Sequence, residues 1–236
     1  MKKIITFTLI ILLNLNLNGQ SLLPVKYGIK IGANIANVKS TANDGVANID
    51  NSSLIGVAGG FYAEIPFNDK WYLKPEIIYI QKGSNFNYSY IHDYVTNQRD
   101  LHNTSHELKL AYAELNPTVS YKKSSNLSFN FGPSIAYLIT PEYRVLSDIG
   151  EDDGEILHEI LPPGEYTEET LDVGLNIGAS YYLSDNLLID GRINTGLMSI
   201  GKISKVIYTG SNGNDVKTNI YDLKNTSIVL SLCYLF

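Results

Sequence analysis

Apolar and polar residues alternate with a period of two along most of this 236-residue chain. Near the C-terminus, every second position is apolar: Ile228, Leu230, Leu232, Tyr234 and Phe236. Successive side chains of a β-strand point to opposite faces, so this spacing predicts a strand with one apolar face. The same pattern predicts seven more strands, within residues 27–36, 57–67, 71–79, 107–121, 129–139, 171–183 and 187–194.

The connections between these strands alternate in length. Residues 68–70, 122–126 and 184–186 are tight, turn-forming segments, whereas residues 39–53, 84–106, 140–168 and 200–223 are long and polar. Short turns on one rim and long loops on the other are typical of membrane barrels. We therefore expect an all-β fold, an eight-stranded antiparallel up-and-down transmembrane β-barrel with short periplasmic turns and long outer loops.

One predicted strand, residues 107–121, is irregular. Its N-terminal apolar residues fall on even positions (Leu108, Leu110, Tyr112), and the following ones fall on odd positions (Ala113, Leu115, Pro117, Val119). An extra residue in one strand would shift the alternation in this way, so we expect a β-bulge here.

Aromatic residues gather at the strand ends beside the short turns, where an interfacial girdle is expected. They are Tyr27, Phe67, Trp71, Tyr72, Tyr121, Tyr181, Tyr182, Tyr234 and Phe236. Tyr62, Tyr79 and Tyr137 are candidates for the opposite girdle.

Charged residues within the predicted strands share the polar parity. A charge facing lipid at mid-bilayer is costly, so these side chains should point into the barrel. They are Lys30, Glu64, Lys74, Glu76, Asp172, Asp190 and Arg192. Eight strands enclose only enough space for side chains, and buried charges must pair. We expect an interior salt-bridge network without an open pore; a proton or ion path along these charges is the alternative.

The N-terminus has the layout of a secretory signal. Lys2 and Lys3 precede an apolar run over residues 4–13, which is short for a spanning helix. Cleavage near residues 19–20 would divide the chain into a signal peptide (1–19) and a barrel domain (20–236). An amphipathic first helix is the alternative. A barrel protein exported by such a signal is expected in the cell outer membrane.

Composition excludes some functions. The whole chain carries a formal charge of −6, and removal of Lys2 and Lys3 makes it −8. An acidic chain repels phosphate backbones, so nucleic acid is not an expected partner. Cys233 is the single cysteine and cannot form an intramolecular disulfide.

Candidate reactive groups are few. His102 and His106 have a spacing that would suit a metal on a helix, but they lie in a polar segment without helical periodicity. The segment 148–159 is rich in carboxylates and could bind Ca²⁺ weakly, although it lacks the EF-hand spacing. Ser147 and His158 are a conceivable nucleophile–base pair, yet no G-x-S-x-G motif is present. We expect no enzymatic activity, cofactor or metal.

Several segments resemble the outer-membrane β-barrel domain family that includes PorT-like proteins. The resemblance implies an OmpA-like barrel of eight strands. The segments are GIKIGANIANV (28–38), LKPEIIYIQKG (73–83), GPSIAYL (132–138) and LDVGLNIGASYYLSDNLLIDGRINTGL (171–197). The segment YAELNP (112–117) departs from the family pattern, because Asn116 precedes the proline. The C-terminus, with Leu232, Tyr234 and Phe236, resembles the signal by which such barrels are recognised for insertion.

A rigid barrel that displays long outer loops predicts a membrane-anchored binding or structural scaffold, because binding usually resides in loops on a rigid support. The resemblance adds an accessory role in protein secretion or envelope assembly. The expected partners are the outer-membrane lipid bilayer, the barrel-assembly machinery, and an envelope or secretion protein bound through the long loops, above all residues 85–100 and 140–168. Two alternatives stay open. One is a small-ligand or lipid-binding barrel, which needs an apolar interior. The other is a soluble periplasmic, lipocalin-like protein with the apolar parity inside.

Overall fold

A computed structural model describes residues 24–41, 50–93, 99–150, 166–209 and 215–236. All regular elements in these ranges are β-strands. Among the described residues, no helix is long and apolar enough to span a membrane. The proposed signal peptide, residues 1–19, lies outside the described residues and stays a prediction.

Eight long strands form a closed ring in which every neighbouring pair is antiparallel. In ring order they are β1 (Lys26–Thr41), β2 (Asp50–Pro66), β3 (Trp71–Asp93), β4 (Arg99–Lys122), β5 (Leu127–Gly150), β7 (Leu171–Tyr182), β8 (Leu187–Gly196) and β10 (Asp215–Leu235). The ring closes where β1 pairs with β10, from Gly28 opposite Leu235 to Thr41 opposite Asp222. The predicted up-and-down barrel is confirmed.

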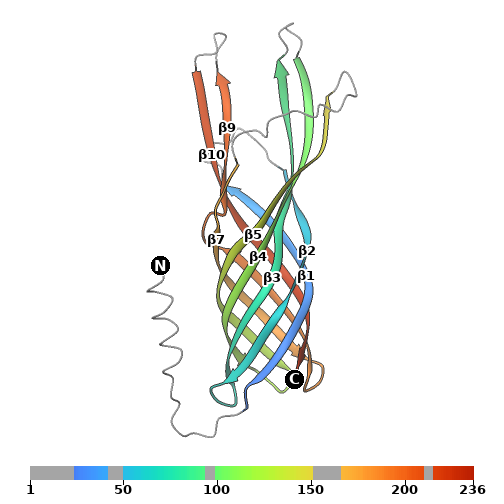
Figure 1. Cartoon of the computed structure of the whole chain (residues 1–236), viewed down its shortest axis with the longest axis vertical. Helices are drawn as coiled ribbons and strands as arrows, with labels where there is room; N and C mark the ends of the chain where they lie inside the picture. The colour runs from blue at the N-terminus through green and yellow to red at the C-terminus, as the bar shows by residue number, and fades with distance from the viewer. Residues whose placement is uncertain (1–23, 42–49, 94–98, 151–165, 210–214) are drawn as a thin grey trace.

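Three tight turns link the strands at the lower rim, beside the C-terminus (Figure 1). In each turn, the backbone amide of the first residue after the strand donates a hydrogen bond to the carbonyl oxygen four residues later. The three bonds are Phe67 to Trp71, Lys123 to Leu127 and Leu183 to Leu187, each 2.8 Å. Asn68 reinforces the first turn, because its side-chain oxygen accepts bonds from the Lys70 and Trp71 amides. These are the short turns predicted from the sequence.

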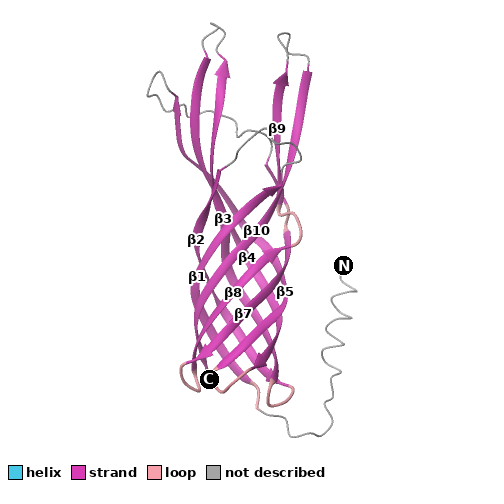
Figure 2. Cartoon of the chain, turned by 180° about the vertical axis from the view of Figure 1, so that it is seen from behind, coloured by secondary structure: helices cyan, strands magenta, loops and turns pink. Residues whose placement is uncertain are grey.

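The upper rim differs from the prediction. Much of the segments expected to be long loops is β-strand: β3 and β4 stay paired up to Asp93 opposite Arg99, and β5 follows β4 up to Gly150. On the other side, β9 (Gly201–Thr209) forms a hairpin with β10, and the short β6 (Tyr166–Glu168) pairs with β9. Figures 1 and 2 show these two strand extensions rising from opposite sides of the barrel.

An apolar belt surrounds the lower part of the barrel. On β1 the outward residues from Tyr27 to Ile35 are apolar, and on β4 the belt runs from Ala113 to Tyr121. These lengths are close to the roughly nine to eleven residues that a tilted strand needs to cross a bilayer. Behind the belt, Lys30, Glu76 and Arg192 are buried inside the barrel. The soluble alternative is therefore wrong, because it requires apolar side chains inside and charges outside at these positions.

Above the belt, the polarity of the two faces is reversed. On β4 the even residues all point inward, first Glu114, Asn116, Thr118 and Ser120, and higher up Tyr112, Leu110, Leu108 and His106. The strand therefore passes from lipid into water, where a folded protein buries apolar side chains and exposes polar ones. Within 107–121, the change of apolar residues from even to odd positions marks this boundary between water and lipid.

The expected bulge is only partly right. The pairing of β4 with β5 does shift between Ala111 and Tyr112, but the extra residue is Ile139 on β5, because Ala111 faces Thr140 and Tyr112 faces Leu138. The alternation along β4 itself is unbroken. The pairing of β4 with β5 shifts again between Ser105 and His106, and that of β2 with β3 shifts between Ser53 and Ala58. Nearby, Gly83 has φ of 144°, a conformation that favours glycine.

The aromatic girdle at the turn rim is present but smaller than predicted. Tyr27, Phe67, Trp71, Tyr181, Tyr234 and Phe236 are exposed there, and Trp71 packs against Tyr121 with ring centroids 4.9 Å apart. Tyr72 and Tyr182, also predicted for this girdle, line a pocket instead. Tyr62, expected in the opposite girdle, is only 3% exposed and lies inside the barrel. Its even position on β2 shares the inward parity of Glu64.

Candidate functional site

The barrel interior at the level of the belt contains a layer of buried ion pairs. Lys30 on β1 lies between two carboxylates, with its Nζ 2.9 Å from Glu76 Oε1 and 3.1 Å from Asp190 Oδ1. On the far side of Glu76, Arg192 Nη1 is 2.5 Å from Oε2. These four residues come from β1, β3 and β8, so their contacts cross the lumen.

Asp190 links this chain of charges to a second lysine. Its Oδ2 atom lies 3.2 Å from Lys74 Nζ and accepts a 2.6 Å hydrogen bond from Ser180 Oγ. Asn130 Nδ2 donates to the same carboxylate oxygen at 3.1 Å, and Ser120 Oγ donates to Asn130 Oδ1 at 2.6 Å. The Asp190 carboxylate is therefore held from several directions, as a buried charge requires.

A second ionic layer lies higher in the lumen. Lys82 Nζ is 2.8 Å from Glu114 Oε2 and 3.1 Å from Asp172 Oδ2. Asp172 also accepts a 2.9 Å bond from Asn225 Nδ2. Neither Lys82 nor Glu114 was among the residues predicted for the interior. Lys82 lies beyond the predicted end of its strand, and Glu114 lies in the irregular segment. Lys82 lies on the same face of β3 as Glu76, and Glu114 lies on the same face of β4 as Asn116. This alternation is the signal that could have identified both as interior residues.

Neutral amides extend the upper layer, because a chain of them connects Glu114 to Asn194, which also accepts a hydrogen bond from Lys82. Asn116 Nδ2 donates to Glu114 Oε1 at 2.9 Å, and Asn176 Nδ2 donates to Asn116 Oδ1 at 2.7 Å. Asn194 Nδ2 then donates to Asn176 Oδ1 at 2.9 Å and to Ser134 Oγ at 2.7 Å. The amides belong to β4, β7 and β8 and form a continuous hydrogen-bonded bridge across the lumen.

The buried charges nearly balance. Within the described residues, four buried cations (Lys30, Lys74, Lys82, Arg192) face five buried carboxylates (Glu64, Glu76, Glu114, Asp172, Asp190). All seven interior residues predicted from the sequence belong to this set. Glu64, near the lower rim, accepts a 2.8 Å hydrogen bond from Tyr182 Oη. Such pairing is what makes charged groups tolerable inside a narrow barrel.

A cluster of apolar side chains surrounds the upper ionic layer and continues above it. It includes Ile80, Leu108, Leu110 and Leu138, each 8% exposed or less, together with Val38, Phe86, Ile200 and Leu223. The residues predicted from the sequence for the interior were all charged, and none of these apolar residues was among them. Most of these apolar residues lie above the belt. The alternation between lipid-facing apolar and inward polar residues that predicts the interior therefore does not apply to them.

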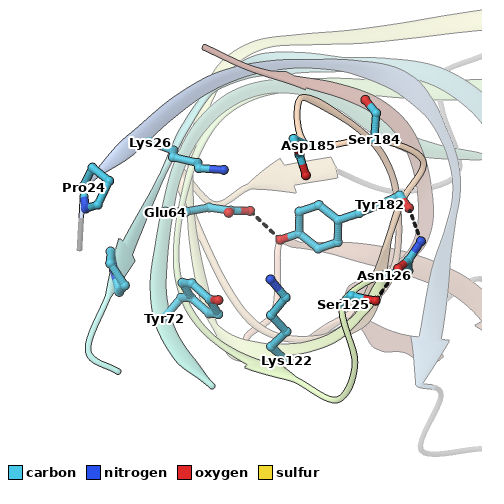
Figure 3. Close-up of a pocket in the computed structure, with 11 residues that line it drawn as sticks. Pro24, Lys26, Glu64, Tyr72, Lys122, Ser125, Asn126, Tyr182, Ser184 and Asp185 are labelled. Carbon is cyan, nitrogen blue, oxygen red and sulfur yellow. Dashed lines mark hydrogen bonds between the residues drawn. The ribbon is translucent and has the colours of Figure 1, made fainter. Parts of the chain in front are cut away.

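A pocket of about 400 Å³ opens at the lower rim (Figure 3). Lys26 and Lys122 enter it from opposite sides, and the hydrogen-bonded pair Glu64–Tyr182 lies between them. Lys122 Nζ is also 5.8 Å from the centroid of the Tyr182 ring. Tyr182, predicted for the girdle, thus points into the barrel mouth.

The candidate metal and catalytic residues do not come together. His102 and His106 lie on one β-strand, where four residues span about 13 Å, too far for two ligands of one ion. The carboxylates of 151–159 and His158 lie outside the described residues, so the Ca²⁺ site and the Ser147–His158 pair stay predictions. No group of three or more His, Cys, Asp or Glu side chains suitable for a metal occurs in the described ranges.

His106 has a tyrosine partner instead. Its Nδ1 lies 2.6 Å from Tyr143 Oη, and the two rings stack with centroids 5.2 Å apart. Both residues lie above the apolar belt. Partial burial raises the pKa of Tyr143 to about 12, so its hydroxyl stays protonated at neutral pH. This contact joins β4 to β5 in the strand extension.

The residues of the proposed insertion signal all face outward. Leu232, Tyr234 and Phe236 are 49%, 45% and 70% exposed on the outer face of β10. The Phe236 amide donates to the Tyr27 carbonyl at 2.8 Å, and its ring meets Tyr234 edge-on at 5.5 Å. The last residue therefore completes the seam between β10 and β1.

Comparison with known proteins gives one family match. The model of the outer membrane protein beta-barrel domain matches residues 18–201. No curated protein matches this chain. Similar solved structures include Neisserial surface protein A (13% identity, 91% of this chain and 100% of that chain, TM-score 0.43) and AlkL in lipid bilayers (9%, 94% and 95%, 0.43). Another is the outer membrane protease OmpT from Escherichia coli (14%, 93% and 99%, 0.34).

These identities and TM-scores are too low to transfer a role. The family match covers most of the chain, and it agrees with the closed ring, the outward apolar belt and the charged interior. This protein belongs to the outer membrane protein beta-barrel domain family.

Proposed function

We propose that this protein is a closed barrel that anchors a binding scaffold in the outer membrane. The observation that carries the proposal is the filled lumen. Two layers of ion pairs, the asparagine bridge and the apolar cluster occupy the space between the strands. An eight-stranded barrel has room for little more than its own side chains. The barrel would therefore serve as a support and would not conduct solutes.

The binding surface would be the strand extensions above the belt. They are paired β-structure, so they hold their shape more firmly than free loops would. On β5, Tyr143 and Leu146 are 41% and 54% exposed above the belt, an apolar surface that lipid does not cover. An envelope or secretion protein is the partner class suggested by the resemblance to PorT-like proteins. Insertion by the barrel-assembly machinery, through Leu232, Tyr234 and Phe236, is part of the same proposal.

Conductance in planar bilayers tests closure. The wild type should give no discrete channels, and E76A/R192A should give them, because this change removes two side chains that meet across the lumen. The matched control is I77A/I193A, which alters the lipid-facing neighbours on the same strands and should stay silent. Steady conductance of the wild type would contradict a closed barrel and favour the ion path.

Cross-linking in cells tests the scaffold role. A photo-reactive residue at Leu146, on the β5 extension, should give a specific adduct with an envelope protein. The same residue at Asp69, in a turn at the opposite rim, is the control. Equal labelling at both positions, or labelling at neither, would contradict an outward binding surface.

The pocket at the lower rim supports a second candidate function, the binding of a small ligand. Its volume of about 400 Å³ is within the usual range for small-molecule sites. It combines two lysines with two carboxylates, Glu64 and Asp185, so a zwitterionic compound fits it better than an apolar one. Saturable binding of such a compound that K26Q/K122Q removes would support this candidate.

A further inference from the structure

Two lysines lie directly opposite each other on the outer wall of the barrel. In the register of β1 with β10, Lys39 pairs with Lys224, and both side chains are exposed. Directly opposite residues of an antiparallel pair have Cβ atoms only about 4.5–5.5 Å apart, and like charges there are destabilising. In the described part of the chain, no ion pair neutralises either lysine.

Lys202, a neighbouring lysine, differs in that respect. Lys202 on β9 lies opposite Asp222 of β10, so a carboxylate is its cross-strand neighbour. Asp222 itself lies opposite Thr41 on the other side. Asp222 shares the outward face of β10 with Lys224, two residues away, but its direct cross-strand neighbours are Lys202 and Thr41, so in the pairing of β1 with β10 Lys39 and Lys224 face each other and not a carboxylate.

The position of the pair relative to lipid is well defined. Below it on the same two strands, the outward pairs are Ile35 with Ile228, Ala33 with Leu230 and Ile31 with Leu232, all apolar. Lys39 is four residues above Ile35, about 13 Å along the strand. With the usual strand tilt this is about 10 Å above the belt, so a lysine side chain that bends towards the membrane reaches the headgroup layer.

We propose that Lys39 and Lys224 form a binding site for a phosphate group of an outer-leaflet lipid. An anion between the two ammonium groups relieves their repulsion and gains two charge-assisted contacts. The acyl chains of the same lipid lie against the apolar column that begins at Ile35 and Ile228. The two halves of an amphiphilic lipid therefore match two adjacent features of one strand pair.

The test uses the full-length barrel in phosphatidylcholine nanodiscs that contain bisphosphorylated lipid A. Native mass spectrometry and the unfolding temperature measure binding. The wild type should retain the lipid and unfold at a higher temperature with it. K39Q/K224Q should bind about tenfold more weakly or worse, because each lysine near an anionic lipid surface contributes substantially. K70Q/K123Q, which removes two exposed lysines from the opposite rim, should bind like the wild type.

Two further arms make the outcome specific. Dephosphorylated lipid A should lose the effect, and inorganic phosphate without lipid A should not reproduce it, which separates a lipid headgroup from a free anion. K224E creates an opposite-charge pair with Lys39, so it should stabilise the barrel in phosphatidylcholine alone and abolish the response to lipid A. Unchanged binding by K39Q/K224Q, or equal binding of the dephosphorylated lipid, would overturn the proposal.

Discussion

Lys82 Nζ and Glu114 Oε2 lie 2.8 Å apart inside the barrel, and each side chain is only 1% exposed. Lys82 belongs to β3 and Glu114 to β4, at the height where the interior changes from ionic to apolar. In the pairing of β3 with β4, Ile80 opposite Tyr112 lies between the levels of Lys82 and Glu114, so the ion pair is surrounded by apolar side chains of the upper interior. Its loss should affect the whole barrel.

Lys82→Met should lower the free energy of unfolding by about 3–5 kcal/mol, because it leaves Glu114 and Asp172 buried without a counter-charge. Lys109→Met, on the outer face of β4, should change it by less than about 0.5 kcal/mol. Denaturant titration of the reconstituted protein, followed by fluorescence of the single Trp71, measures both. Equal effects of the two substitutions would contradict a structural role for the buried pair.

Gly83→Ala should destabilise the barrel by about 1–3 kcal/mol. Gly83 has φ of 144°, and an added Cβ would lie 1.9 Å from the Leu108 carbonyl oxygen. Gly191→Ala is the matched control, since its Cβ would meet only Leu230 Cδ1 at 3.8 Å. The same titration compares the two variants. If Gly191→Ala proved the more harmful, the described bulge between β2 and β3 would be wrong.

The same charge placed at two heights on β4 locates the membrane boundary. Leu115→Arg should cost about 2–4 kcal/mol in bilayers, because this outward side chain is in the belt. Glu107→Arg, outward on the same strand but above the belt, should be nearly neutral. Unfolding in lipid vesicles measures both. Similar costs at the two positions would mean that the belt extends further than Ala113.

Phe236→Ser should reduce the amount of assembled barrel in cells several-fold, if the C-terminal residues act as the insertion signal. The purified, refolded variant should lose much less stability, because the Phe236 ring is 70% exposed and its amide still bonds to Tyr27. Gel migration with and without boiling in SDS quantifies the folded fraction. Normal assembly in cells would rule out an essential role of this residue as a signal.

The sequence alone determined the fold class and which side chains of the membrane-spanning strands point into the barrel. Lipid outside and charge inside impose opposite preferences on adjacent residues, so alternation over strands such as 27–35 and 187–194 reports the topology directly. The short turns were equally clear, since Asn68 and Ser184 are residue types that close turns through their side chains.

The tertiary structure decided what lies above the belt and which charges meet. There the strands continue in water, so the inward positions are mostly apolar and the outward positions mostly polar, the reverse of the pattern in the belt. For this reason the alternation in residues 107–112 conflicted with that of 113–121, and the strand extensions were predicted to be loops. Contacts such as Lys30 with Asp190, 160 positions apart, depend on the relative heights of strands around the ring. The same holds for Lys39 and Lys224. Register between distant strands arises from closure of the whole sheet, which no local pattern encodes.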